Sequence, residues 1–154
     1  GGQENGIRSG TENVAGAVGF AEALTRAVKH RAHESHRLAV LRSKLEQIIT
    51  SSIGDVVVNG HPKQRAPHIL HISVPGLDGE RAVFGLDERG VMAATGSACA
   101  ANNGTRSHVL TAIGMSDELA DGSLRFSLGR STTEDEITRA GAIITEVVAE
   151  ERTR

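Results

Sequence analysis

The sequence predicts an α/β protein of the α+β kind, in which a long N-terminal helical segment precedes a small mixed sheet of about four strands. Three observations predict this class. Apolar residues recur at helical spacing between residues 14 and 49, short β-branched runs bounded by glycine or proline follow, and helical spacing returns after residue 133. Packing the helices on one face of the sheet is the simplest way to bury these apolar positions.

The first third of the chain predicts helix after an irregular start. Residues 1–10 are rich in glycine and polar side chains and show no periodicity. Thr11 is a candidate N-cap. Because the polar stretch 30–36 contains no proline, one long helix or two helices meeting at a bend fit equally well. The apolar positions at helical spacing, of which the first six are expected to form one buried stripe, are Val14, Ala17, Val18, Ala21, Leu24, Val28, Leu38, Leu41, Leu45, Ile48 and Ile49.

The elements that follow are shorter. Strands are predicted where β-branched or alternating residues are bounded by turn signals, at 56–58, 68–74, 91–94 and 124–128. Helices are predicted at 80–89 and 107–113, and each is followed by a glycine in the usual C′ position. Thr133 and Glu136 have the spacing of a capping box, so a last helix is expected to begin there.

Composition excludes several classes of protein. Seventeen Lys and Arg balance nineteen Asp and Glu, so we expect neither a nucleic-acid partner nor a membrane surface. No apolar run reaches the roughly 18 residues that span a bilayer. The single cysteine excludes an internal disulfide framework and a cysteine-rich metal site. With no signal peptide at its start, the chain is expected to be cytoplasmic, and its opening without Met suggests a piece of a longer chain.

Cys99 is the first candidate for chemistry. It lies in the segment 95–104, where glycines bracket small and polar side chains, so this loop is expected to be mobile and accessible. A lone cysteine is more often a small buried hydrophobe, and that alternative stays open. The context favours a nucleophile that collects an atom at one site and delivers it at another, and a helix beginning after the loop favours its thiolate.

Arg125 is the second candidate. In the alternating strand, Leu124 and Phe126 share one face, and Arg125 and Ser127 share the other. Arg125 is therefore either a solvated arginine of an edge strand or a guanidinium fork offered to a carboxylate. Arg130 is a weaker candidate for the same task.

Other polar residues predict less. The junction from Arg8 to Thr11 joins a glycine-rich loop to a helix, which suits either a phosphate or a plain helix cap. No metal site is expected, and a Cys99–His108 dyad is possible but not favoured. His30, His33 and His36 suit a solvated helix face. His68 and His71 fall on opposite faces of a strand, so they do not form a shared site.

Four segments, in the same order, resemble motifs of cysteine desulfurases of the iron–sulfur-cluster and nitrogen-fixation type. Residues 1–13 are similar to their G-G-x-E-x-G-x-R-x-G-T segment, and 95–99 to their S-G-S-A-C nucleophile loop. Residues 107–114 resemble the helix after that loop, and 123–130 resemble their I-R-F-S-L-G-R strand. Together these segments extend across most of the chain.

The resemblance implies a fold, a reaction and residue roles. Such enzymes are homodimers of fold-type I that use pyridoxal 5′-phosphate (PLP) to remove sulfur from L-cysteine, leaving L-alanine. By resemblance, Cys99 becomes the persulfide that passes sulfur to an acceptor or scaffold protein. Arg125 holds the substrate carboxylate, and Thr11 hydrogen-bonds the PLP phosphate of the partner subunit.

The resemblance also implies that the chain is the C-terminal part of such an enzyme. The family's Schiff-base lysine lies upstream in an S-x-H-K context, which none of Lys29, Lys44 and Lys63 has. The isolated piece is therefore expected to be inactive. The expected division is a cofactor and dimer-contact loop at 1–11, connecting helices at 12–52, and a small domain at 53–154.

Two alternatives stay open. The first is a non-catalytic module that accepts persulfide on Cys99 or binds a scaffold protein. The second is another class-V aminotransferase or a selenocysteine lyase, which the Cys99 loop disfavours.

Overall fold

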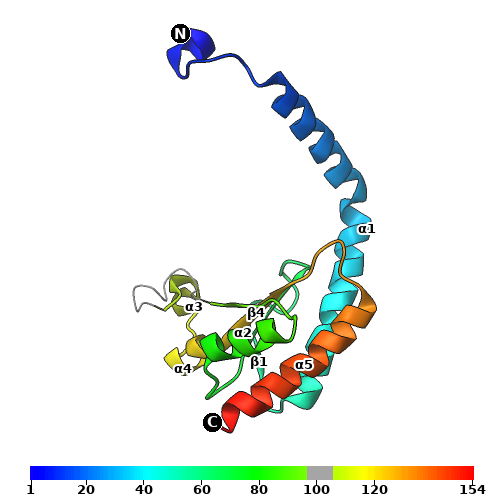
Figure 1. Ribbon diagram of the computed structural model, residues 1–154, viewed down its shortest axis with the longest axis vertical. Coiled ribbons are helices and arrows are strands. Elements are labelled where there is room, and N and C mark those ends of the chain that lie inside the picture. The colour runs from blue at the N-terminus through cyan, green and yellow to red at the C-terminus, as the bar shows by residue number, and fades with distance from the viewer. Residues whose placement is uncertain (97–105) are drawn as a thin grey trace. The chain divides into compact units, whose positions relative to one another are not determined.

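The computed structural model describes residues 1–96 and 106–154 (Figure 1). The chain divides into two compact units, Gly1–Glu34 and Ser35–Arg154, and each is described by itself. Helix α1 (Val14–Ser52) is continuous through the polar stretch 30–36, so the sequence pattern belongs to one long helix. The boundary between the units therefore lies inside this helix.

The first unit consists of a short 3-10 turn, η1 (Gln3–Gly6), and the beginning of α1. Asn13, and not Thr11, caps the helix, because its Oδ1 accepts a hydrogen bond from the Gly16 backbone N–H at 2.9 Å. The expected burial of the apolar stripe is wrong for this unit. Val14, Val18, Leu24 and Val28 of this stripe are between 53% and 66% exposed, since a turn and a single helix offer nothing to cover them.

The second unit is built on a four-stranded sheet in the order β1-β2-β4-β3. The strands are β1 (Val57–Val58), β2 (Ile69–Ser73), β3 (Ala94–Thr95) and β4 (Ser123–Ser127). Four strands confirm the expectation, but every pairing is antiparallel, which corrects the expected mixed sheet. β2 and β3 run parallel to each other and are joined through a helix, but β4 lies between them, so no parallel pair forms.

Helices pack on one face of this sheet, as expected. They are α2 (Gly79–Glu88), α5 (Glu134–Arg152) and the second part of α1, which lies beside α5 (Figure 1). The buried core joins inward side chains of the strands with those of the three helices. Burying each such Leu or Ile contributes about 1.5–3 kcal/mol. The leucines and isoleucines with no exposed surface are Ile49, Leu70, Ile72, Leu86, Leu124 and Ile144.

Helix ends follow the local sequence closely. Thr133 and Glu136 form the expected capping box at the start of α5. Asp78 caps α2 by accepting from two backbone N–H groups, and Gly90 follows that helix with a φ of 79°. Two short helices precede β4, the expected α3 (His108–Ala112) and an unexpected α4 (Asp117–Asp121), which Ser116 caps. The third strand begins three residues later than expected, at Ala94.

Candidate functional site

Arg125 lies on the sheet face opposite the core. Its neighbours Leu124 and Phe126 are buried, whereas Arg125 and Ser127 are exposed, which confirms the alternation expected for this strand. Among residues 1–96 and 106–154, no carboxylate forms an ion pair with the Arg125 guanidinium. The strand thus presents a permanent positive charge, with planar donors, on a rigid backbone.

Two cross-strand neighbours flank Arg125. In the sheet register it stands opposite Ala94 of β3 on one side and His71 of β2 on the other. Directly opposed residues share a face, with Cβ atoms about 5 Å apart. Burial lowers the pKa of His71, and the positive charge of Arg125 lowers it further. The imidazole beside Arg125 is therefore neutral near pH 7.

Asn59 connects His71 to Ser73 on this face. The Asn59 backbone N–H donates to the His71 carbonyl oxygen at 2.8 Å. Its Nδ2 donates to Ser73 Oγ at 2.8 Å and lies 3.4 Å from His71 Nδ1. Two atoms of this cluster, His71 Nε2 and Asn59 Oδ1, are shielded from solvent and have no hydrogen-bond partner in the described part of the chain.

The other predicted site residues lie elsewhere. Thr11 is exposed in the first unit, where its carbonyl oxygen and that of Gly10 accept from Arg8 Nη1 at 3.4 and 2.6 Å. Arg130 is exposed after β4, and its carbonyl oxygen accepts from Arg37 Nη2 at 2.9 Å. Cys99 and most of its loop lie outside the described residues, so the structure does not test the predicted nucleophile or its pairing with His108.

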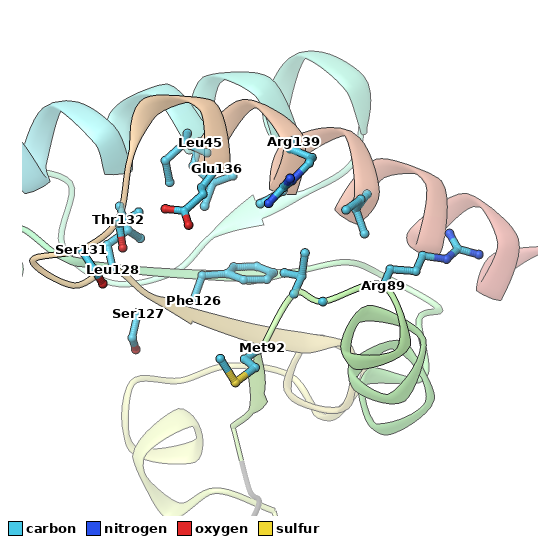
Figure 2. Close-up of a pocket in the computed structure, with 15 residues that line it drawn as sticks. Leu45, Arg89, Met92, Phe126, Ser127, Leu128, Ser131, Thr132, Glu136 and Arg139 are labelled. Carbon is cyan, nitrogen blue, oxygen red and sulfur yellow. The ribbon is translucent and has the colours of Figure 1, made fainter.

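A cleft of about 600 Å³ opens on the core side of β4, away from the Arg125 face (Figure 2). The Phe126 ring lies inside it, and Met92, Glu136 and Arg139 surround it. Arg89 also lines the cleft, but its guanidinium donates to Glu150 at 2.6 Å. None of the predicted site residues that the structure describes lines this cleft.

The histidines of α1 hold no metal site. His30, His33 and His36 are exposed, and His33 lies 3.7 Å from Glu34. Across the described ranges, no group of three His, Cys, Asp or Glu side chains is arranged to hold a metal ion. No helix there combines the length and apolar character needed to cross a membrane.

Comparison with known proteins identifies the family. The family model for class-V aminotransferases matches residues 2–140. The chain belongs to the class-V aminotransferase family. Cysteine desulfurase IscS of Clostridium botulinum (strain Hall) is 39% identical over 155 residues, covering 99% of this chain and 39% of that protein. IscS of Photorhabdus laumondii is 45% identical over 144 residues, covering 94% of this chain and 35% of that protein.

A solved structure agrees with these class-V relatives. A NifS-like protein superposes with a TM-score of 0.81 at 31% identity, covering 97% of this chain and 38% of that chain. The resemblance to cysteine desulfurases inferred from the four motifs is thereby confirmed. The chain spans about two fifths of the length of the relatives it matches.

The lysines of this class-V chain do not fit the role of holding PLP. A Schiff-base lysine must be neutral, which calls for a desolvated pocket or a neighbouring cation. Lys44 instead donates to the Glu134 carboxylate at 2.7 Å, so its amine is already held by an ion pair. Lys29 and Lys63 are exposed. This chain therefore holds no lysine suited to anchoring the cofactor.

Sequence reasoning missed His71. His68 and His71 lie in the same strand with their side chains on opposite faces, so the two histidines predict no shared site. The alternation of Ile69, His71 and Ser73 does predict a shared face. What it could not predict is that β4 would place Arg125 on that face, next to His71.

Proposed function

We propose that this chain carries the sulfur-accepting cysteine and the substrate-binding arginine of a PLP-dependent cysteine desulfurase. The reaction removes the sulfur of L-cysteine, leaving L-alanine, and forms a persulfide on Cys99. That sulfur then passes to an acceptor or scaffold protein in iron–sulfur cluster assembly. PLP supplies the electron sink when bound, and the lysine that holds it belongs to another part of the complete protein.

The observation that supports this proposal best is the state of Arg125. A guanidinium without a carboxylate partner in the described residues, on a face that the helices α1, α2 and α5 leave uncovered, suits a carboxylate ligand. Both curated relatives compared above are named cysteine desulfurases, and L-cysteine offers that carboxylate.

Further parts of the proposal come from the family resemblance. We assign Thr11 to the PLP phosphate of the partner subunit in a homodimer, and the complete protein to the cytoplasm. The exposed position of Thr11 in a glycine-rich loop suits such a contact. We also propose the division into a contact loop at 1–11, a connecting segment at 12–52 that contains the single helix α1, and a small domain at 53–154 that carries the cysteine loop 95–104.

The surroundings of the three lysines favour a second candidate function for the 154-residue chain by itself. With no lysine suited to the cofactor, the 154 residues alone would act as a non-catalytic module that accepts persulfide on Cys99 or binds a scaffold protein. The reading frame that precedes Gly1 discriminates the two. A continuous frame encoding the lysine motif supports the enzyme, and a start codon immediately upstream supports the module.

The decisive experiment compares the complete gene product with its Cys99→Ser variant. We expect the wild type to convert L-cysteine to L-alanine and to carry a persulfide, detected by mass spectrometry as one added sulfur. In Cys99→Ser, we expect alanine formation to fall by more than a hundredfold, while L-cysteine still changes the absorbance of the cofactor.

The 154-residue chain, supplied with L-cysteine and PLP, serves as the control and should produce no alanine. Sustained alanine production by this chain, or full activity of Cys99→Ser, would contradict the proposal.

A further inference from the structure

His71 shares the sheet face opposite the core with the residue proposed to bind the substrate carboxylate. Its Cα is paired with that of Arg125, so the two side chains leave neighbouring strands on the same side. The other side chains on this face in the two strands are Ile69, Ser73, Ser123 and Ser127. Arg125 and His71 are thus the two residues with titratable side chains on this face of β2 and β4.

The hydrogen-bond network around Ser73 determines which nitrogen of His71 carries the proton. Ser73 Oγ donates to Met115 Sδ at 3.6 Å, and a thioether sulfur can only accept. The hydroxyl hydrogen is thereby used, so Ser73 Oγ accepts from its other neighbour, which is the amide nitrogen of Asn59 at 2.8 Å. The orientation of the Asn59 amide follows from the position of that one hydrogen.

The Asn59 amide in turn determines the imidazole tautomer. Its Nδ2 faces His71 Nδ1 at 3.4 Å, and because Nδ2 is a donor, Nδ1 is the acceptor. In a neutral imidazole the single proton then resides on Nε2. Burial and the neighbouring Arg125 both lower the pKa of His71, which keeps the ring in this neutral form.

Nε2–H is therefore a shielded donor, and it has no partner in the parts of the chain that the structure describes. Leaving such a donor unsatisfied costs about 1–3 kcal/mol, so a ligand that supplies an acceptor here would be favoured. A carboxylate that reaches Nε2 would accept its hydrogen at a position shielded from solvent. The bond then forms away from bulk water, where it is stronger.

We propose that His71 Nε2–H is a second donor to the substrate carboxylate, beside the guanidinium of Arg125. This inference rests on the proposed function. A carboxylate accepts two parallel hydrogen bonds from a guanidinium and has further lone pairs for a third donor. The neutral imidazole adds direction without a second positive charge, so the pair selects substrates whose carboxylate lies over the shared face of β2 and β4, next to both side chains.

The test uses the complete gene product and two substitutions of unequal chemistry. His71→Phe keeps a planar ring and removes the donor, whereas His71→Gln places an amide N–H near the position of Nε2. We expect His71→Phe to raise the KM for L-cysteine about tenfold and to keep kcat within twofold of the wild type. The KM of His71→Gln should lie much closer to that of the wild type, because the amide N–H replaces the lost donor. The tenfold figure corresponds to one hydrogen bond to a charged group.

A carboxylate-free analogue separates binding from a structural effect. Cysteamine keeps the amine and thiol of L-cysteine and lacks the carboxylate, so its inhibition constant should be the same in wild type and His71→Phe. An equal loss for cysteamine and L-cysteine would overturn the inference, because it would show general damage to the site.

Arg125→Ala distinguishes failure of this inference from failure of the proposed function. If Arg125→Ala raises the KM for L-cysteine and His71→Phe does not, the inference about His71 is wrong and the proposed function stands. If neither variant changes it, the proposed carboxylate site fails as a whole.

Should His71→Phe not fold, ¹⁵N NMR of the wild-type imidazole decides. The Nε2–H tautomer, with an Nε2 shift that moves on adding L-cysteine, supports the inference. The Nδ1–H tautomer, or an unchanged shift at saturating L-cysteine, overturns it.

Discussion

At the scale of single residues, the site depends on the charge of Arg125, which has no counter-ion among the described residues. Arg125 extends from a strand whose neighbouring side chains are buried, so its backbone is held in place by the core. An arginine in that setting binds a carboxylate through two parallel hydrogen bonds. Lysine offers a point charge on a flexible stem and lacks the planar pair of donors.

Substitution of Arg125 in the complete protein tests this role. We expect Arg125→Ala to raise the KM for L-cysteine about tenfold to a hundredfold, because hydrogen bonds to a charged partner are lost. The KM of Arg125→Lys for L-cysteine should lie between the KM of Arg125→Ala and that of the wild type. Arg130→Ala tests the weaker candidate for the same carboxylate, and an unchanged KM in that variant would assign the role to Arg125. Steady-state kinetics measure all three, and an unchanged KM in Arg125→Ala would contradict the role.

At the scale of elements, the position of Arg125 depends on how the chain enters β4. Gly122 follows α4, and its backbone makes two hydrogen bonds. Its carbonyl oxygen accepts from the Val74 N–H at 3.0 Å, and its N–H donates to the Glu118 carbonyl oxygen at 3.1 Å. A Cβ at this position would overlap the Val74 carbonyl oxygen and lie 3.2 Å from that of Leu77. Since both obstacles are backbone atoms, no side-chain rotation can relieve the overlap.

Gly122→Ala should therefore destabilise the 154-residue chain by about 1–3 kcal/mol, the usual cost of overpacking. Gly129→Ala is the matched control at the other end of β4, where a Cβ would meet nothing within 4 Å. Its free energy of unfolding should stay within about 0.5 kcal/mol of the wild type. Urea unfolding followed by circular dichroism measures both, and equal stability of the two variants would show that the strand entry tolerates a side chain.

At the scale of the whole molecule, ion pairs connect segments of the second unit that are far apart in the sequence. Arg152 near the C-terminus binds Asp55, which follows α1, and Lys44 of α1 binds Glu134 at the start of α5. The hydrogen bond from Arg152 lowers the pKa of Asp55, and that from Lys44 lowers the pKa of Glu134. A carboxyl group whose pKa is lowered by folding stabilises the fold above its unfolded pKa.

This stabilisation is lost as the pH falls through the folded pKa. We expect the free energy of unfolding to decline below a pH of about 4.5, near the unfolded pKa of glutamate. Asp55→Asn should make the decline shallower, because one of these carboxyl groups no longer titrates. Asp87→Asn is the control, since the Asp87 side chain contacts no charged partner in the described residues. Urea unfolding between pH 6 and 3 tests this, and parallel curves for wild type and Asp55→Asn would contradict it.

The sequence by itself determined the features that depend on near neighbours. Helical spacing predicted α1, the Thr133–Glu136 pair predicted the start of α5, and alternation predicted that Arg125 and the core residues point to opposite faces. The four motifs also predicted the family. Each of these depends on residues a few positions apart, where the periods of helix and strand and the chemistry of caps act directly.

Only the tertiary structure decided which distant segments meet. It placed β4 between β2 and β3, and so brought His71 beside Arg125. It also showed that the stripe headed by Val14 is uncovered in its own unit. Periodicity shows which face of an element is apolar or polar, but it does not identify the partner, because strand pairing between distant segments depends on how the whole chain packs.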